Sequence, residues 1–273
     1  MSVTITASDV NKLRTMTGAG MMDCKKALTE ANGDFEAAID LLRKKGQKVA
    51  ANRSDRDAKE GLVIAQTNGT RGVVIVLNCE TDFVAKNEDF GKVAESFAKI
   101  ALEQKPADLT SLLALNYEGM PISEKIVEMV GKIGEKIEIS AYEQAESTQV
   151  TAYNHPGNKL ACIVAFNKAI SEGAARDVAM QVAAMAPVAV DKDDVDTTVL
   201  ERELDVAREQ VRAEGKPEDM VEKIAQGKLN KFYKESTLLN QEFIKDAKKT
   251  IRQYLQETDK EMTVTTFKRI ALG

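Results

Sequence analysis

The sequence predicts an α+β protein with a small N-terminal three-helix domain, a duplicated α/β core with antiparallel sheets, and an inserted antiparallel helical hairpin. Three observations lead to this prediction. Helical spacing with cap and turn residues occupies the first part of the chain, a strand–turn–strand–helix order occurs twice, and a charged pair of helical segments follows. Helices packed on one face of antiparallel sheets are typical of the α+β class.

The first part of the chain, residues 6–46, has the pattern of three short helices. Thr6 and Asp9 resemble a capping box, with the shorter Asp in the place of Glu. The Gly-Ala-Gly run at residues 18–20 ends the first helix, and Asp23 is expected to cap the second. A bundle of about forty residues is too small to be very stable alone.

The next segment, Arg43–Lys59, is polar and rich in charge, which predicts a linker or a solvated helix. A nucleic-acid-binding arm is the alternative, but Asp55, Asp57 and Glu60 dilute its positive charge. The whole chain has a net charge of −5 and a pI of about 5.3. Nucleic acid is therefore not expected as a direct partner.

The core is predicted from two similar runs. Leu62–Gln66 and Val73–Cys79 have the pattern of a β-hairpin, and a helix follows them. The same order returns about 87 residues further on, with strands at Thr148–Tyr153 and Leu160–Phe166 before another helix. A further helix (Ile122–Ile133) and strand complete the first copy. The repeat is one of pattern and not of residue identity.

The second copy is interrupted by a charged insertion. Leu200, Leu204, Ala207 and Val211 are spaced by four and three, as in a coiled-coil seam, and a Gly-Lys-Pro run then breaks the helix. Two helices joined in this way form an antiparallel hairpin. After it, residues 248–257 are predicted as a helix and 262–272 as a closing strand.

These patterns divide the chain into four predicted parts. They are an N-terminal three-helix domain with its linker (1–55), core subdomain N (56–143), core subdomain C (144–190 and 237–273) and the helical hairpin (191–236).

Several classes of protein are excluded by composition and pattern. No run of uncharged apolar residues is long enough to span a membrane, and the N-terminus lacks the regions of a signal peptide. Cys24, Cys79 and Cys162 are odd in number and far apart, which favours reduced thiols in a cytoplasmic protein. With a single histidine and no Cys-x-x-Cys spacing, neither a zinc site nor any cofactor is expected.

The sequence contains no recognisable catalytic group, so no enzyme activity is expected. Cys24 is followed by Lys25 and Lys26, which could lower a thiol pKa, and a thiol-dependent enzyme is therefore one hypothesis. No histidine or carboxylate partner stands near it. The glycines at residues 18–20 follow a helix instead of a strand, so they do not form a dinucleotide fingerprint.

Two segments are candidates for binding a partner. Met21 and Met22 follow the glycines directly, and methionine adapts well to partner surfaces. Filling of the core at a helix start is the alternative. The Thr81–Val84 segment leaves a strand and places a carboxylate beside a phenylalanine before the next helix. There, the alternative is a capping Asp with Phe83 tucked under that helix.

Two longer motifs carry a resemblance to a known family. The first is Leu13–Leu28 (LRTMTGAGMMDCKKAL), followed by Glu30–Asp34 (EANGD), and the second is Asn78–Lys86 (NCETDFVAK). Both resemble signatures of bacterial elongation factor Ts, and the domain order is similar over essentially the whole chain. The resemblance implies a guanine-nucleotide exchange factor for elongation factor Tu, binding its GDP-bound and nucleotide-free forms, in translation elongation.

The resemblance also implies site residues. The family's magnesium-dislodging segment corresponds to Thr81, Asp82, Phe83 and Val84.

Further partner contacts correspond to Met21, Met22 and His155. The proline after His155 alters its turn relative to the family pattern. The chain ends at Gly273, and the C-terminal helical module of longer members is expected to be absent. The alternative function is a non-catalytic interaction or chaperone-like protein that acts through the helical hairpin.

Overall fold

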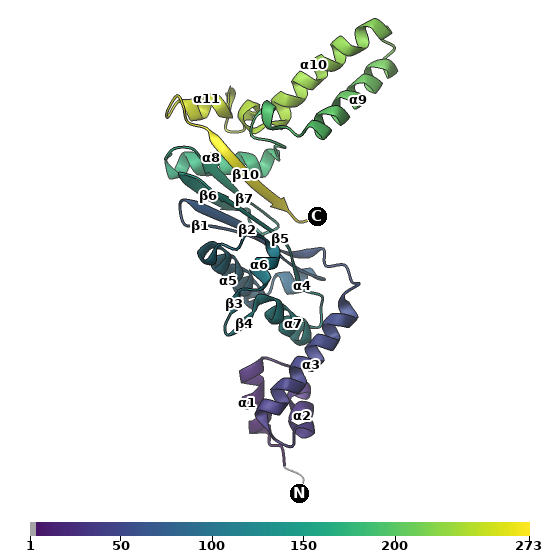
Figure 1. The fold of residues 1–273 in the computed structure, drawn as a ribbon, viewed down its shortest axis with the longest axis vertical. Helices are drawn as coiled ribbons and strands as arrows, with labels where there is room; N and C mark the ends of the chain where they lie inside the picture. Colours follow the sequence, from purple (N-terminus) through teal and green to yellow (C-terminus); the bar gives the residue numbers. More distant parts are fainter. Residues whose placement is uncertain (1–3) are drawn as a thin grey trace. The chain divides into compact units, whose positions relative to one another are not determined.

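The computed structural model describes residues 4–273, which form a mixed structure of the predicted α+β class (Figure 1). The chain divides into two compact units. The bounds of the first are Met1–Val63, Ile75–Tyr142 and Leu272–Gly273, and those of the second are Ile64–Val74 and Glu143–Ala271. The four predicted parts stay a prediction, because this division separates only two units.

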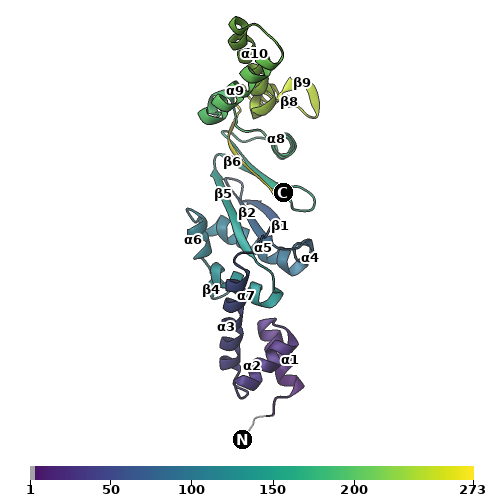
Figure 2. The ribbon, with the colours of Figure 1, turned by 90° about the vertical axis from the view of Figure 1, so that its right-hand side faces the viewer.

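Three helices come first in the chain and pack together within the first unit (Figures 1 and 2). They are α1 (Ala7–Thr17), α2 (Met21–Glu30) and α3 (Phe35–Arg53). The predicted capping box is confirmed, because Thr6 and Asp9 each accept a hydrogen bond from the other's backbone N–H. The apolar faces of the helices share one core, formed by Val10, Leu13, Cys24, Ala27, Leu28 and Ala38.

The predicted cap of α2 is wrong. The helix begins after Gly20, which has an extended backbone, so Asp23 is already the third helical residue. The Asp23 carboxylate instead pairs with the Lys45 ammonium at 2.5 Å. Helix α3 is also longer than the predicted bundle. Of the two alternatives for Arg43–Lys59, the helix is correct as far as Arg53.

Helices α3 and α7 (Ile122–Ile133) cross at two glycines in the first unit. A Cβ atom on Gly131 would lie 2.6 Å from the Gly46 Cα atom, and a Cβ on Gly46 would lie 3.3 Å from the Val127 carbonyl oxygen. The two backbones are therefore in direct contact, which a side chain at position 131 would prevent. The C-terminal ends of both helices contribute to the site described below.

The first sheet has the strand order β1-β2-β5. Its strands are β1 (Glu60–Thr67), β2 (Arg71–Cys79) and β5 (Glu138–Glu146), which confirms the strands predicted near residues 62 and 73. Strand β2 is central and buried along its whole length. The elements between β2 and β5, apart from α7, are α4 (Asp82–Ala85), α5 (Glu88–Gln104), α6 (Leu109–Leu113), β3 (Asn116–Tyr117) and β4 (Met120–Pro121).

The second sheet has the order β10-β7-β6, with both neighbours of β7 antiparallel to it. Its strands are β6 (Gln149–Asn154), β7 (Leu160–Phe166) and β10 (Val264–Ala271). Helix α8 (Glu172–Met185) packs against β6 and β7, which confirms the helix predicted after the second pair of strands. In both sheets the second strand of the hairpin is central, which is the order that a duplicated unit would have.

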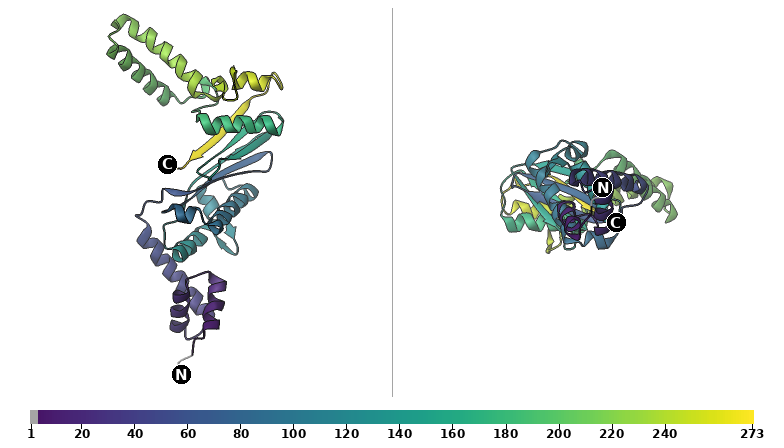
Figure 3. Two further views of the ribbon diagram at one scale, coloured as in Figure 1. Left: turned by 180° about the vertical axis from the view of Figure 1, so that it is seen from behind. Right: turned by 90° about the horizontal axis from the view of Figure 1, so that it is seen from below.

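The predicted helical hairpin consists of α9 (Thr197–Ala213) and α10 (Glu218–Ser236), which lie side by side in the second unit (Figures 1 and 3). Ion pairs join the two helices along their length. Arg208 pairs with Glu222, Arg212 with Glu218, and Lys228 with Glu214. A short 3₁₀ turn lies on each side of the hairpin, at Lys192–Asp194 and Leu238–Asn240.

The helix predicted at 248–257 is partly wrong. Strands β8 (Glu242–Phe243) and β9 (Asp246–Thr250) form a small hairpin, and helix α11 (Ile251–Gln256) begins only after it. Thr250 caps α11 in a capping box with Gln253. An N-cap residue has an extended backbone, so Thr250 is both the last residue of β9 and the cap of α11.

Candidate partner-binding site

Three of the predicted site residues are large apolar side chains in contact with solvent. The exposed fraction is 82% for Phe83, 74% for Met22 and 51% for Met21. The alternatives that would bury these side chains, under a helix or in a core, are therefore wrong. An isolated exposed apolar residue is ordinary, but aromatic side chains are enriched in protein interfaces, so this exposure makes Phe83 a candidate contact residue.

The Phe83 side chain belongs to α4, a single helical turn directly after strand β2. Thr81 is the N-cap residue with an extended backbone, and Ala85 faces inward and is buried. The Asp82 carboxylate accepts a hydrogen bond from the Lys86 ammonium at 2.6 Å, one turn later, and this bond raises the pKa of Lys86. With Ala85 inside, Phe83 is left pointing outward.

The chain before α4 is held by two carboxylates from different segments. Glu135 accepts hydrogen bonds from the backbone N–H groups of Glu80 and Thr81 (3.1 and 3.0 Å) and from the Thr81 hydroxyl (2.6 Å). Glu80 in turn accepts the backbone N–H of Lys136 at 2.6 Å and two bonds from Arg53 Nη1, both 3.0 Å. We call this arrangement of Arg53, Glu80, Thr81, Glu135 and Lys136 the carboxylate clasp.

The clasp also has an electrostatic consequence. The backbone N–H of Lys136, followed by the Arg53 guanidinium, lowers the pKa of Glu80 below its usual value, so the charged carboxylate is favoured in the folded protein. The Cys79 thiol adds a further bond, donated to the Thr81 carbonyl oxygen at 3.1 Å. The backbone leading to Phe83 is therefore fixed by several independent hydrogen bonds.

The methionine pair lies at the start of α2, beyond a turn that requires glycine. Gly18 has a φ of 65°, a backbone conformation that favours glycine, and it ends α1. Cys24, one turn after the methionines, is fully buried, and its thiol donates to the Ala19 carbonyl oxygen at 3.7 Å. The thiol-dependent enzyme hypothesis fails at this point, because a substrate has no access to the sulfur.

His155 lies in the second unit, in the exposed turn between β6 and β7. Its Nδ1 atom is 3.1 Å from the Tyr153 hydroxyl, and its backbone carbonyl accepts the N–H of Asn158. The ring is thus oriented by Tyr153 and remains available to a partner.

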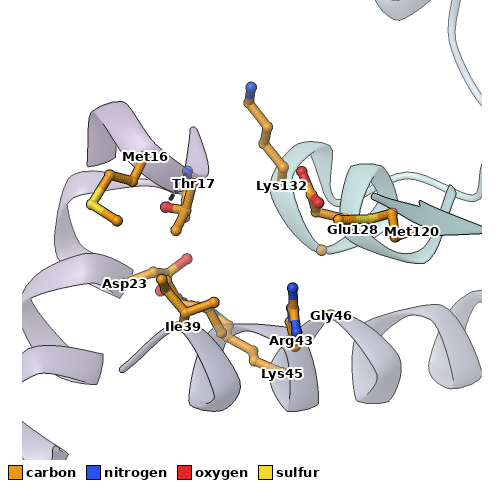
Figure 4. A pocket seen from close by; sticks show the side chains of 13 residues that line it. Met16, Thr17, Asp23, Ile39, Arg43, Lys45, Gly46, Met120, Glu128 and Lys132 are labelled. Atoms are coloured by element: carbon orange, nitrogen blue, oxygen red, sulfur yellow. Dashed lines mark hydrogen bonds and ion pairs between the residues drawn. The ribbon is translucent and has the colours of Figure 1, made fainter. Parts of the chain in front are cut away.

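A cavity of about 220 Å³ lies in the first unit between the three N-terminal helices and α7 (Figure 4). The residues labelled in the view are Met16, Thr17, Asp23, Ile39, Arg43, Lys45, Gly46, Met120, Glu128 and Lys132. Asp23 is paired with Lys45, and Glu128 with Lys125 at 3.0 Å, so these carboxylates already have cationic partners. The cavity contains none of the predicted site residues.

Metal and membrane sites receive no support from the described part of the chain. Among residues 4–273, no three histidine, cysteine, aspartate or glutamate side chains are grouped to hold a metal ion. Within the same residues, no helix has the length and apolar character needed to cross a bilayer.

Sequence reasoning missed the residues that hold Phe83 in place. Glu135 and Arg53 stand 54 and 27 residues from their partners in the segment, and no local pattern connects them. It also missed Ile133, the last residue of α7, which is 37% exposed and lies two residues before Glu135. An apolar residue beside a helix-ending glycine was the only available signal.

Comparison with known proteins gives a consistent result. The family described as "Elongation factor TS" matches residues 80–273. The protein named "Elongation factor Ts" from Christiangramia forsetii is 52% identical over 273 residues, covering 98% of this chain and 99% of its own. Its namesakes from Amoebophilus asiaticus and Bacteroides thetaiotaomicron are 54% and 41% identical, each over 98% of this chain and 99% and 98% of their own.

Proposed function

The chain belongs to the elongation factor Ts family, and from this premise we propose that it is a guanine-nucleotide exchange factor that promotes GDP release from elongation factor Tu. The observation that carries the proposal is the state of Phe83. Its ring is 82% exposed, while the backbone two residues before it is held by the carboxylate clasp. A rigidly presented aromatic ring is suited to insertion into another protein.

The proposed mechanism begins with the burial of this ring in the partner. Burial of an exposed phenylalanine is worth about 1.5–3 kcal/mol, enough to displace a neighbouring element of the partner. Magnesium at a bound nucleotide requires nearly ideal octahedral geometry, so a small shift of its ligands weakens it steeply. Asp82, held by Lys86, enters with the ring, and Thr81 and Val84 flank it.

Loss of the magnesium ion then releases the nucleotide. Without the cation, the phosphate charge of GDP is poorly balanced, and GDP leaves; GTP can then bind and expel the exchange factor. The coupling is reciprocal, so GDP must weaken the exchange factor's binding by the same factor. A thousandfold effect corresponds to about 4 kcal/mol, within reach of one buried aromatic and a few further contacts. No covalent step and no cofactor of this chain are needed.

Met21, Met22 and His155 supply further contacts in this proposal. The two methionines are exposed and unbranched, so they can adapt to an irregular partner surface. His155 can donate or accept a hydrogen bond from its exposed turn. Ile133, which is 37% exposed and lies two residues before Glu135 in the chain, is a further candidate for an apolar contact.

The test is the rate at which fluorescent GDP leaves elongation factor Tu in a stopped-flow instrument. The intact chain is expected to accelerate release, and Phe83→Ala to lose about 30-fold of that acceleration, which corresponds to about 2 kcal/mol at the centre of an interface. Met220→Ala, at an exposed apolar residue of the hairpin, is the matched control and is expected to leave the rate unchanged.

Two results would contradict the proposal. Absence of acceleration by the intact chain would remove the exchange function. A normal rate for Phe83→Ala, together with a large loss for Met220→Ala, would move the working surface to the hairpin and favour the alternative function.

A further inference from the structure

We infer that Glu135 is a positioning residue for the exchange reaction: its carboxylate fixes the backbone of Glu80 and Thr81 and thereby sets the direction in which Phe83 projects. The inference rests on the proposed function, since it concerns how the same segment is presented to elongation factor Tu. Glu135 is not one of the exposed residues that the proposed function places in contact with elongation factor Tu, so its role would be indirect.

The hydrogen bonds that Glu135 accepts are concentrated at one place in the chain. All three end on two consecutive residues, with Oε2 receiving both backbone N–H groups and Oε1 receiving the Thr81 hydroxyl. Glu135 forms no ion pair within the described residues 4–273. The carboxylate therefore serves only to immobilise the residues at which the chain leaves β2 and enters α4.

The two segments of the clasp hold each other reciprocally. The Glu80 carboxylate bonds the backbone N–H of Lys136, while the Glu135 carboxylate bonds the backbone N–H of Glu80. Each segment thus fixes the other at both its side chain and its main chain. Arg53 adds two bonds to Glu80 from the last residue of α3, so rotation of the segment about a single bond is blocked.

Glu135 has no role in ending the helix that precedes it. Helix α7 ends at Ile133, and its C-cap is Gly134, in the left-handed conformation with a backbone bond to the Val130 carbonyl. The Glu135 side chain is therefore not required to terminate α7. Its position after the glycine turns it toward Thr81, away from the helix.

Positioning matters because an inserting ring must arrive in one orientation. Holding a binding group in its bound conformation beforehand removes the entropic cost of ordering it on binding. If the clasp were lost, Phe83 would stay exposed but would sample several directions. This ordering cost would fall on the insertion of the ring, whereas Met21, Met22 and His155 would still contact the partner. The maximal rate of GDP release should therefore fall by a larger factor than the affinity of the complex.

The experiment compares Glu135→Ala with Glu135→Gln. Glutamine keeps the length and one carbonyl oxygen for the two backbone N–H groups, and its amide can donate to the Thr81 hydroxyl, so it should restore the clasp. Glu138→Ala is the matched control: it removes a nearby carboxylate whose one ion pair among the described residues is with the Lys136 ammonium, at 3.3 Å, and which forms no bond there to the backbone of Glu80 or Thr81. Circular dichroism and urea unfolding establish that each variant is folded.

Two readouts are taken for each variant. Amide hydrogen exchange at Glu80 and Thr81, measured by NMR on the free protein, should be slow in the wild type, Glu135→Gln and Glu138→Ala, and at least about tenfold faster in Glu135→Ala. In stopped flow, Glu135→Ala should lower the maximal rate of GDP release about tenfold with a smaller change in the half-saturating concentration. Glu135→Gln and Glu138→Ala should stay near the wild-type rate.

The outcomes separate this inference from the proposed function. Fast amide exchange in Glu135→Ala with an unchanged maximal rate of GDP release would overturn the positioning role while leaving the exchange function intact. Slow amide exchange in Glu135→Ala would overturn the clasp itself. Failure of the wild-type chain to accelerate GDP release would instead overturn the exchange function, whatever the amides show.

Discussion

The connection that follows the central strand differs sharply between the two sheets. After β2, the chain runs through Glu80–Asn87 and leaves Phe83 82% exposed before Asn87 caps α5. After β7, it runs through Asn167–Ser171 and buries Ile170 at 8% exposure before Ser171 caps α8. The same strand order therefore accommodates either a sealed or a protruding connection, and the fold itself does not require the exposed phenylalanine.

The two connections are nevertheless tied down in a similar way. In the second unit, the Asn167 side chain donates to the Glu261 carbonyl (2.7 Å) and accepts the Thr263 N–H (2.8 Å), just before β10. In the first, Glu80 and Thr81 bond to Glu135 and Lys136, just before β5. Each connection is anchored to the residues that precede the third strand, and only the first presents an apolar ring beyond the anchor.

The largest expected effects come from truncating Phe83 and Ile170 to alanine, one in each connection. Ile170→Ala should lower the free energy of unfolding by about 2–4 kcal/mol, because it leaves a cavity in the core beside α8. Phe83→Ala should change it by less than about 0.5 kcal/mol while slowing GDP release about 30-fold. Urea unfolding and stopped flow measure the two quantities. Equal destabilisation by both substitutions would break the comparison.

The next largest effect is expected at the crossing of α3 and α7, which brings the clasp residues together. Gly131→Ala should cost about 1–3 kcal/mol, because its Cβ would lie 2.6 Å from the Gly46 Cα atom and the backbones must separate. In Gly46→Ala the tightest contact of the new Cβ is with the Val127 carbonyl oxygen at 3.3 Å, and the better helix propensity of alanine offsets that contact. Thermal unfolding should rank Gly131→Ala well below Gly46→Ala; the reverse order would be inconsistent with this packing.

A smaller effect is expected from the anchor of the second connection. Asn167→Asp removes the donor to the Glu261 carbonyl and places a carboxylate against that oxygen, at a cost of about 1–2 kcal/mol. GDP release should be unaffected, because no predicted site residue lies on this connection. A slowed release at unchanged stability would show that this connection also presents a binding surface.

The smallest effect is expected in the loss of folding stability at low pH. The pKa of Glu80 in the folded chain is lowered below the ordinary value of 4.5, so its contribution to stability is present above about pH 4.5 and is lost as the pH falls through the lower folded value. The wild type should therefore lose more stability than Glu80→Gln on acidification from pH 6 to pH 3, as measured by urea unfolding at each pH. Parallel losses would contradict the proposed anchoring of Glu80.

Asp259 offers the corresponding measurement in the second unit. The hydrogen bond from the Lys168 ammonium lowers the pKa of its carboxyl, so the same sign applies, and Asp259→Asn should also flatten the acid dependence. Because this ion pair is more exposed than the Glu80 carboxylate, its contribution should be the smaller of the two.

Much of the fold could be predicted because its signals are local. Short apolar runs separated by turn residues identified both hairpins, helical spacing identified α7, α9 and α10, and Thr6 with Asp9 identified the start of α1. The errors also have local causes. Asp23 is a good cap residue by type, but the helix begins two residues before it, at Met21. The polar residues of β9 are equally suited to a helix, so pattern alone could not exclude one.

The site was predictable in a different sense. Motif resemblance selected Thr81–Val84, Met21, Met22 and His155, and the structure adds that all of the apolar ones, apart from the half-buried Val84, are well exposed. Residue spacing alone favoured a buried Phe83, because a ring before an amphipathic helix usually packs under it. Neither line of reasoning identified Glu135 or Arg53.

The sequence by itself determined the class of the fold, the order of its longer helices and strands, and the family, since each follows from short-range periodicity or from contiguous motifs. Only the tertiary structure decided that Phe83 faces solvent and that Glu135 and Arg53 hold the chain beside it. The physical reason is range: a helix or strand is specified by neighbours a few residues apart, whereas the clasp joins residues up to 56 positions apart that meet only after α3 and α7 have packed.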